Sequence, residues 1–346
     1  MLSNENYRYD SFRLGDVEVI HFCRTEFDFT VLARKFDGLI IGGGALLDDT
    51  TFETTWRGFV SLSTIVAKLP LYFHARNKPV LCIGLSCNAQ LHNKKFSSYI
   101  AEVSAKSEHF SVRDEYSLRK LDEIGVNSCD IKLVDDIVLS NSIWLKERVL
   151  SHKPKKTGVF SVALTWTTFV EDCDNRLLLV IRSISNVVHE MGMRLDLCLI
   201  PFFNSAESDS QYFLKIIKMF PTLDSNNIVV ANYPNTIEDV ANIFDNVDYA
   251  INMRYHASLI CGALGIPQLI LAPLGHRHYK NKMEWVGRQF SKSLILMDVA
   301  EIADGVDDKF KEVVKMSRGA GISHERVKNN IANLKEVINN LREKSK

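Results

Sequence analysis

The sequence lacks an excess of charge of either sign. Its 346 residues include 42 Lys and Arg and 42 Asp and Glu, so the formal net charge is zero. A chain without a net field does not attract nucleic acid or an anionic membrane as a whole. We therefore expect no nucleic-acid partner and at most peripheral membrane contact. Any anion that the protein binds must be held by a local group of basic side chains.

Long hydrophobic runs are missing as well. No stretch approaches the roughly 18 consecutive apolar residues of a membrane-spanning helix, and the opening MLSNENYRYDSFRLGD lacks the apolar segment of a signal peptide. The seven cysteines form no CxxC pair, and several lie inside apolar runs, where a free thiol behaves as a small hydrophobic group. No cluster of His, Cys and Asp has the spacing of metal ligands, so we expect no metal. These absences favour a cytoplasmic protein, with the inner face of the membrane as the alternative location.

The remaining composition is that of a packed globular protein, with 46% hydrophobic and 24% charged residues. The length favours two domains, because domains usually have about 100 to 200 residues. Short apolar runs alternate with longer amphipathic stretches, which is typical of strands and helices around a parallel sheet. We predict an α/β fold with two Rossmann-like, doubly wound domains at 1–150 and 157–300, then C-terminal helices at 301–346. The basic segment 146–158 is the predicted linker.

The predicted strands form two series, one in each domain. They lie at 17–22, 38–41, 80–84, 110–113 and 131–134, and then at 159–163, 195–200, 228–231, 249–252, 268–271 and 294–297. The segments FDGLIIGGG and VDYAINMRYH each begin with an Asp before a buried strand, and each is followed by a helical stretch and a proline-led strand. In doubly wound sheets these strands have equivalent places, so we expect the loops at their carboxyl ends to face one cleft.

Near the end of the chain, Ser323 is a plausible N-cap before apolar residues at helical spacing. This pattern predicts a terminal helix packed on a domain, with a polar face in solvent. Contact of that face with an anionic membrane or a lipid-linked acceptor is the alternative.

A run of three glycines, Gly42, Gly43 and Gly44, closes the second predicted strand and precedes ALLDD. Glycines there let the backbone approach a ligand closely, and amides of a following helix can bind an anion or sugar oxygens. A tight turn from strand to helix explains the run equally well, because the pattern matches neither GxGxxG nor a Walker sequence.

The strongest group of candidate ligands comes after the predicted strand 249–252. Arg254 and His256 stand two apart, and in an extended segment both side chains would project to the same side and reach one anion. A surface ion pair and a backbone-bound histidine remain the alternative. Arg113, at another strand end, is a second possible phosphate ligand, and Asp114 is interpreted as the cap of the helix that follows.

A predicted loop after the strand 268–271 is dense in cations. Its sequence LGHRHYKNKMEW contains His276, His278, Lys280 and Lys282. Such a loop is usually only solvated, but here it would flank the same cleft as Arg254.

Three segments together resemble the polysaccharide pyruvyltransferase family. Members carry a GGG-x-L-x-D turn, a VRD-x-x-S-x-x-x-L-x-x-x-G segment, and R-x-H-A followed by a G-I-P strand. This chain has GGGALLDD, VRDEYSLRKLDEIG and RYHASLICGALGIP in the same order, and the match spans about 36–285. The resemblance implies a GT-B-like architecture with the active site between two Rossmann-like domains, of which 1–150 is the acceptor side and 157–300 the donor side.

The resemblance also implies a reaction. Family members take phosphoenolpyruvate as donor substrate and place a pyruvate ketal on a sugar of a polysaccharide, which requires no cofactor. Carried across by motif, Arg254 and His256 would hold or protonate the donor phosphate, and Arg113 would add charge near the phosphate or carboxylate. Lys280 or Lys282 would correspond to a family lysine after the G-I-P strand.

The reaction needs a general acid near neutral pH, which histidine supplies. His256 is the first candidate, followed by His276, His278 and His92. Asp49 is the candidate base for the acceptor hydroxyl.

The acceptor is expected to contact a further group of residues near the ends of the second and third predicted strands, namely Gly43, Gly44, Ser86 and Asn88. The segment CIGLSCNAQL departs from the turn that relatives often have there, so Ser86, Asn88 and Gln90 would bind either a different acceptor or none. A sugar and a lipid-linked oligosaccharide both stay open as acceptors, and so does a homo-oligomer.

Two other functions remain. A nucleotide-sugar glycosyltransferase on the same architecture would want an acidic residue for the donor ribose, and Glu284 is the candidate. A non-catalytic family member in a polysaccharide assembly complex is the other, although Arg113, Arg254 and His256 are all retained.

Overall fold

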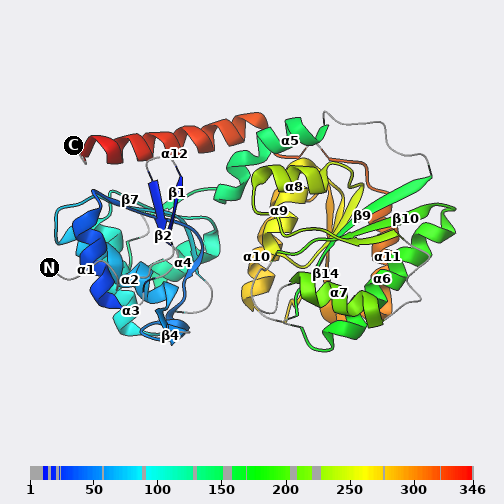
Figure 1. Cartoon of the computed structure of the whole chain (residues 1–346), viewed down its shortest axis with the longest axis horizontal. Helices are drawn as coiled ribbons and strands as arrows, with labels where there is room; N and C mark the ends of the chain where they lie inside the picture. Colours follow the sequence, from blue (N-terminus) through cyan, green and yellow to red (C-terminus); the bar gives the residue numbers. More distant parts are fainter. Residues whose placement is uncertain are drawn as a thin grey trace. The chain divides into compact units, whose positions relative to one another are not determined.

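A computed structural model describes residues 11–14, 17–20, 23, 25–56, 58–87, 91–127, 131–150, 158–168, 170–202, 209–219, 227–275, 277–319 and 321–344. The chain forms two compact units, and each has its own parallel sheet (Figure 1). Unit 1 comprises Met1–Ile137 and Asn329–Lys346, and unit 2 comprises Val138–Lys328. Among the described residues, no helix combines the length and the apolar character needed to cross a bilayer.

The sheet of unit 1 has four parallel strands in the order β3-β6-β7-β8. Its strands are β3 Leu39–Leu47, β6 Val80–Cys87, β7 His109–Val112 and β8 Lys132–Leu133, and its helices include α1 Glu26–Lys35, α2 Leu62–His74, α3 Lys94–Lys106 and α4 Glu115–Glu123. Val80 and Cys82 pack into the core that α1, α2 and α3 share, because alternate residues of a strand face opposite sides. Leu81 and Ile83 therefore face the other side of the sheet.

In unit 1, α2, α3 and α4 each begin after a residue whose side chain accepts a hydrogen bond from the first turn of the helix. Ser61 Oγ accepts from the Thr64 amide at 3.3 Å before α2, and Asn93 Oδ1 accepts from the Lys95 amide at 3.0 Å before α3. Asp114 opens α4, so the predicted capping role of this residue is confirmed. Such caps satisfy amides that have no partner within the helix.

Two antiparallel hairpins accompany this sheet. They are β1 Ser11–Leu14 with β2 Val17–Ile20, and β4 Thr55–Trp56 with β5 Phe59–Val60. The predicted strand at 17–22 therefore exists as β2, but its assignment to the parallel series is wrong in the described structure, because its neighbour β1 runs antiparallel to it.

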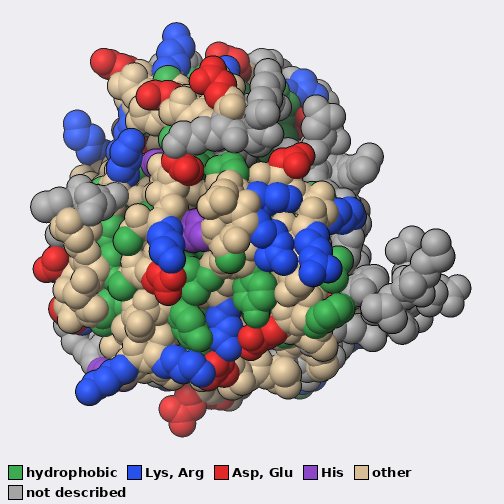
Figure 2. Space-filling view, turned by 90° about the vertical axis from the view of Figure 1, so that its left-hand side faces the viewer, with side chains coloured by type: hydrophobic (Ala, Val, Ile, Leu, Met, Phe, Trp, Pro, Cys, Tyr) green, Lys and Arg blue, Asp and Glu red, His purple; other side chains and the backbone are tan. Residues whose placement is uncertain are grey.

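One face of the molecule mixes basic, acidic and hydrophobic side chains (Figure 2), as expected of a chain without net charge.

Unit 2 has a six-stranded parallel sheet in the order β11-β10-β9-β12-β13-β14. Its strands are β9 Val159–Thr165, β10 Arg194–Leu199, β11 Asn227–Val230, β12 Tyr249–Asn252, β13 Gln268–Ala272 and β14 Leu294–Asp298. Its helices are α5 Ser142–Leu150, α6 Cys173–Glu190, α7 Asp209–Met219, α8 Ile237–Phe244, α9 Tyr255–Leu264, α10 Arg277–Gln289 and α11 Ile302–Val314. Strand order reverses at the β9–β12 pair, which defines a topological switch point.

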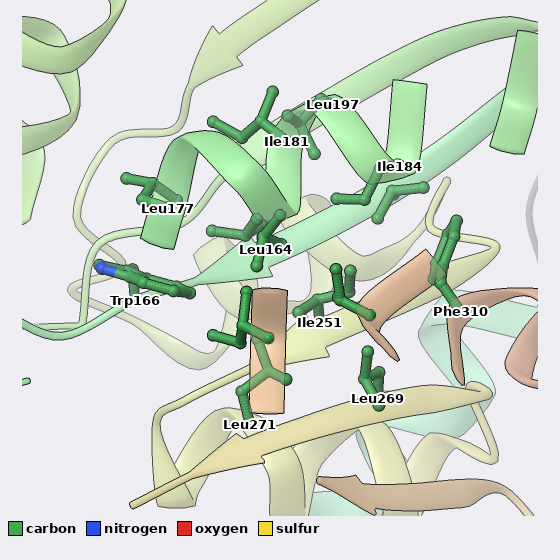
Figure 3. Packing of buried hydrophobic residues seen from close by; sticks show 14 of the residues in the cluster. Leu164, Trp166, Leu177, Ile181, Ile184, Leu197, Ile251, Leu269, Leu271 and Phe310 are labelled. Carbon is green, nitrogen blue, oxygen red and sulfur yellow. The ribbon is translucent and has the colours of Figure 1, made fainter. Parts of the chain in front are cut away.

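Helices cover both faces of this sheet. Val162 and Leu164 of β9 pack on one side in a core with α6 and α11 (Figure 3), whereas Ala163 packs on the other side in a core with α5, α8 and α9. The sheet is therefore doubly wound, as the alternation of strands and helices predicted. Leu145 and Val149 of α5 are buried in the second core, so the predicted linker at 146–158 begins inside a packed helix. Residues 151–157 lie outside the described residues.

The terminal helix α12, His324–Lys344, begins in unit 2 and continues into unit 1. Ser323 Oγ accepts a hydrogen bond from the Arg326 amide at 3.3 Å, so the predicted start of this helix is confirmed. Leu334 and Val337 line a cavity of about 510 Å³ in unit 1, together with residues of β6. The polar side chains of the helix that are described otherwise lie mostly in solvent, as the sequence predicted.

Candidate functional site

Arg254 lies at the switch point of unit 2, where β12 ends and α9 begins. Its Nε donates a hydrogen bond to the backbone oxygen of Trp166, which follows β9, at 2.9 Å. Its Nη2 donates to Asp209 Oδ1 at 2.5 Å, and the side chain is 16% exposed. The carboxyl ends of β9 and β12 thus hold one guanidinium in a defined place, where open α/β sheets bind their ligands.

The contact with Trp166 is fixed by packing. The indole ring is 1% exposed and belongs to the core that Leu164 and Leu177 share, at the edge of which Figure 3 shows it. A ring so enclosed holds its own backbone in place, because a packed side chain has few alternative positions. The carbonyl that accepts from Arg254 Nε is therefore held from the interior of unit 2.

His256 lies in the first turn of α9 and is exposed. Its ring contacts Tyr255 edge-on, with 5.4 Å between the centroids, and Lys282 Nζ lies 5.9 Å from the centroid of the Tyr255 ring. The predicted extended segment from Arg254 to His256 is wrong, because only Arg254, at φ −98° and ψ 128°, has extended backbone, and helix α9 begins at the next residue. The first amides of α9 and the His256 ring are therefore neighbours on one helix end.

The cationic segment after β13 is a helix, and its prediction as a loop is wrong. It forms α10, on which Met283 and Val286 are fully buried three residues apart. This spacing places both side chains on one apolar face. Exposed Lys280 forms an ion pair with Glu284, four residues further along the helix, with 3.9 Å between Nζ and Oε1. The structure thus places Lys282 beside Tyr255, next to His256, while His276 and the side chain of His278 lie outside the described residues.

A second hydrogen-bonded group lies at the start of α6 in unit 2. The Tyr212 hydroxyl donates to Asp174 Oδ1 at 2.8 Å and holds the pKa of that carboxyl below its ordinary value. Burial raises the pKa of the neighbouring Cys173 thiol. Within the described ranges, no group of three His, Cys, Asp or Glu side chains is arranged to hold a metal ion.

The glycine run of unit 1 lies inside β3 and not in a turn before a helix. Gly43 and Gly44 have φ of 52° and 118°, and the pairing of β3 with β6 becomes irregular between Gly44 and Leu47. Positive φ is accessible to glycine at little cost, so these residues let the strand change its register and continue. A three-residue 3₁₀ helix follows at Asp49–Thr51.

Asp49 is 9% exposed and acts within unit 1 as a hydrogen-bond acceptor for the loop before α3. Its Oδ2 accepts from the amides of His92 and Asn93, the second at 2.5 Å. The side chain therefore anchors the residues that open α3. Its assignment as the base for the acceptor hydroxyl stays a prediction.

Ser86, predicted to contact the acceptor, is buried in a network of unit 1. Its Oγ donates to Asp114 Oδ2 at 2.7 Å, and Ser117 Oγ donates to Asp114 Oδ1 at 2.7 Å. The amide of Cys87 donates to Ser117 Oγ, also at 2.7 Å. This network ties the end of β6 to the start of α4. Asn88, the next acceptor candidate, lies outside the described residues together with Gln90.

Arg113 follows β7 and is 3% exposed. Its Nη1 donates to Asp136 Oδ2 at 2.6 Å, and the Asp136 side chain is 1% exposed. A buried ion pair of this kind fixes both partners, because neither charge can be left alone in a low-dielectric interior. The sequence motifs did not identify Asp136 and Asp209, the carboxylate partners of Arg113 and Arg254. Asp136 follows a predicted strand and Asp209 begins a helix, and the sequence contains no stronger signal for either.

The structure is similar to solved structures of proteins that have the GT-B fold. UDP-GlcNAc 2-epimerase from Methanocaldococcus jannaschii, in complex with UDP-GlcNAc and UDP, is 11% identical at a TM-score of 0.52, covering 90% of this chain and 79% of the other. The enzyme from Neisseria meningitidis bound to UDP-GlcNAc is 12% identical at 0.52, covering 89% and 78%. A trehalose-phosphate synthase from Burkholderia xenovorans is 9% identical at 0.50, covering 100% and 90%. These likenesses show that the chain has the GT-B fold.

The sequence provides the family. Residues 2–274 match the polysaccharide pyruvyl transferase family, and this range is more than half of the chain. No curated protein matches the sequence. The chain belongs to the polysaccharide pyruvyl transferase family, as the three sequence segments indicated.

Proposed function

We propose that this protein transfers pyruvate from phosphoenolpyruvate to two hydroxyls of a sugar, forming a ketal and releasing phosphate. The proposal is supported by membership of the family and by one observation above all. Arg254 is held at the switch point of unit 2, and His256 lies two residues further on, at the start of α9. A fixed cation, helix amides and a titratable imidazole at one sheet edge suit an anionic donor that must be protonated.

The reaction requires two changes at the enolpyruvyl group. A proton is added to the methylene carbon, and a sugar hydroxyl bonds to the adjacent carbon as that hydroxyl loses its proton. The bond from this carbon to the phosphate oxygen then breaks, and phosphate leaves with the electron pair. A second hydroxyl closes the ketal by bonding to the same carbon, and its proton passes to the released phosphate. His256 is the general acid of this scheme, and Arg254 stabilises the negative charge of the departing phosphate.

Lys282 is the preferred lysine on the donor side. It contacts Tyr255, which precedes His256, whereas Lys280 forms an ion pair with Glu284. Arg113 belongs to unit 1 and is paired with Asp136. We also propose that Arg113 is a ligand of the donor. The proposal further includes a saccharide acceptor and a cytoplasmic site of action.

The test is phosphate release from phosphoenolpyruvate, measured with a panel of hexose and N-acetylhexosamine acceptors. We expect acceptor-dependent release by the wild type, and loss of most of it in His256→Ala, because positioned acids contribute about 10²–10⁴-fold. His189→Ala is the matched control, since His189 is an exposed histidine at the end of α6 in the same unit. Absence of release with every acceptor, together with stabilisation by a UDP-sugar but not by phosphoenolpyruvate, would favour a glycosyltransferase instead.

A further inference from the structure

Asp209 is a buried carboxylate that joins three strand ends of unit 2. It is the first residue of α7, and its side chain is 5% exposed. Its Oδ1 accepts from Arg254 Nη2 at 2.5 Å, and its Oδ2 accepts from the amide of Phe202 at 2.9 Å. Phe202 follows β10, and Arg254 follows β12. The backbone oxygen of Trp166, which follows β9, completes the set by accepting from Arg254 Nε.

The two oxygens of Asp209 have different partners, and this division restricts the carboxylate. The bond from the Phe202 amide fixes its position relative to the end of β10, while the bond to Arg254 is charged on both sides. Charge-assisted hydrogen bonds are about twice as strong as neutral ones, and a buried carboxylate requires such a partner. The guanidinium is consequently held through Nε by a carbonyl and through Nη2 by a carboxylate.

We propose that Asp209 is a positioning residue, which orients the Arg254 guanidinium for the phosphate of the donor. The inference rests on the proposed function, because it assigns to Asp209 the placing of a group that this function uses. A long arginine side chain without such partners populates many rotamers, and ordering it on binding costs affinity. Asp209 removes this cost before the donor arrives.

The same ion pair permits an opposite role, which the experiment distinguishes. A carboxylate beside Arg254 lowers the positive potential that a phosphate meets, so Asp209 acting only as a competing charge would weaken donor binding. Its removal would then lower the KM for phosphoenolpyruvate. A positioning residue predicts the reverse, because the guanidinium loses its fixed orientation.

The experiment compares KM and kcat for phosphoenolpyruvate in wild type, Asp209→Ala and Asp209→Asn. We expect the KM for phosphoenolpyruvate to rise at least about tenfold in Asp209→Ala, as loss of a charged hydrogen bond implies, with the KM for the acceptor unchanged. Asp209→Asn keeps one acceptor oxygen in the same shape, so its KM should lie between the two. If Asp209→Ala does not fold, the asparagine variant alone carries the test.

Asp298→Ala is the matched control. Asp298 is the last residue of β14, and its Oδ1 accepts from the Ala300 amide at 2.9 Å, so it is another capping carboxylate at the carboxyl edge of this sheet. A rise in KM for phosphoenolpyruvate that is equal in this control overturns the inference.

A double-mutant cycle with Arg254→Ala separates positioning from stability. If Asp209 acts through Arg254, then Asp209→Ala has no further effect on the KM for phosphoenolpyruvate once Arg254 is absent. Additive effects, or an unchanged or lowered KM in Asp209→Ala, overturn the inference and leave the proposed function standing. Absence of turnover by the wild type with every acceptor overturns both.

Discussion

Gly265, the glycine of the GIP segment, should be intolerant of any side chain because of a close backbone approach in unit 2. It ends α9 with φ 68°, and a β-carbon at this position would lie 2.1 Å from the backbone oxygen of Gly319. The two segments are also joined by a hydrogen bond of 2.8 Å from the Gly319 amide to the Gly265 oxygen. Replacement by alanine must therefore displace backbone and not merely a flexible side chain.

The magnitude has two parts. An alanine in left-handed conformation costs about 1–2 kcal/mol, and a forced displacement of packed atoms typically adds about 1–3 kcal/mol. Gly192 supplies the matched control, because it follows α6 with φ 69° and has nothing within 4 Å of its would-be β-carbon. Gly192→Ala should therefore lower the free energy of unfolding only by the cost of the left-handed backbone, and not by the cost of displaced atoms.

Thermal unfolding of the full-length chain measures the difference. For a unit of this size, about 1 kcal/mol shifts the Tm by about 2–4 °C, so Gly265→Ala should melt about 2–12 °C below Gly192→Ala. Equal Tm values for the two variants would refute the reasoning, since they would mean that the contact with Gly319 has no energetic consequence.

Three further predictions concern buried groups. Asp136→Ala should lower the free energy of unfolding by about 3–5 kcal/mol in a denaturant titration, because it removes the carboxylate from the buried Arg113, and a loss below about 1 kcal/mol would contradict this. Burial raises the pKa of the Cys82 and Cys261 thiols to about 12, so a thiol reagent at pH 8 should modify them in unfolded but not in native protein. Burial, and then Lys132, lowers the pKa of His109, so native protein disfavours its protonation. The free energy of unfolding should thus fall as pH decreases below about 6.5, less steeply in His109→Gln, and equal slopes would count against this.

The fold was predictable because both sheets follow from local periodicity. The predicted strand at 249–252 coincides with β12, and most other predicted strands differ from the observed ones by a few residues. The largest difference is in β3, which continues to Leu47 although three glycines interrupt its apolar run. Pairing with β6 extends β3 through the glycines, and a local sequence pattern carries no information about which strand will be the partner.

The candidate site was predictable only in part. Sequence motifs identified Arg254 and His256, but the carboxylate partner of Arg254 lies 45 residues away along the chain, and Asp136 lies 23 residues from Arg113. Pairs of this separation depend on how strands are ordered in the sheet, which one sequence does not specify.

The cationic segment of α10 was misassigned for a different reason. The prediction of a loop rested on its charged residues, but Met283, Val286 and Phe290 have helical spacing and all three are buried. That spacing predicts an amphipathic helix, and burial of the apolar face decides the outcome over the exposed lysines.

In the proposed reaction, pyruvate moves from phosphoenolpyruvate to a sugar, and the methylene carbon is protonated. The most direct test is to incubate the protein with phosphoenolpyruvate and an acceptor sugar in D₂O, and to analyse the sugar by mass spectrometry and NMR. We expect a pyruvate ketal on the sugar whose methyl group carries one solvent deuterium, formed together with phosphate and lost in His256→Ala. A sugar that is unmodified by phosphoenolpyruvate but gains a glycosyl residue from a UDP-sugar would contradict it.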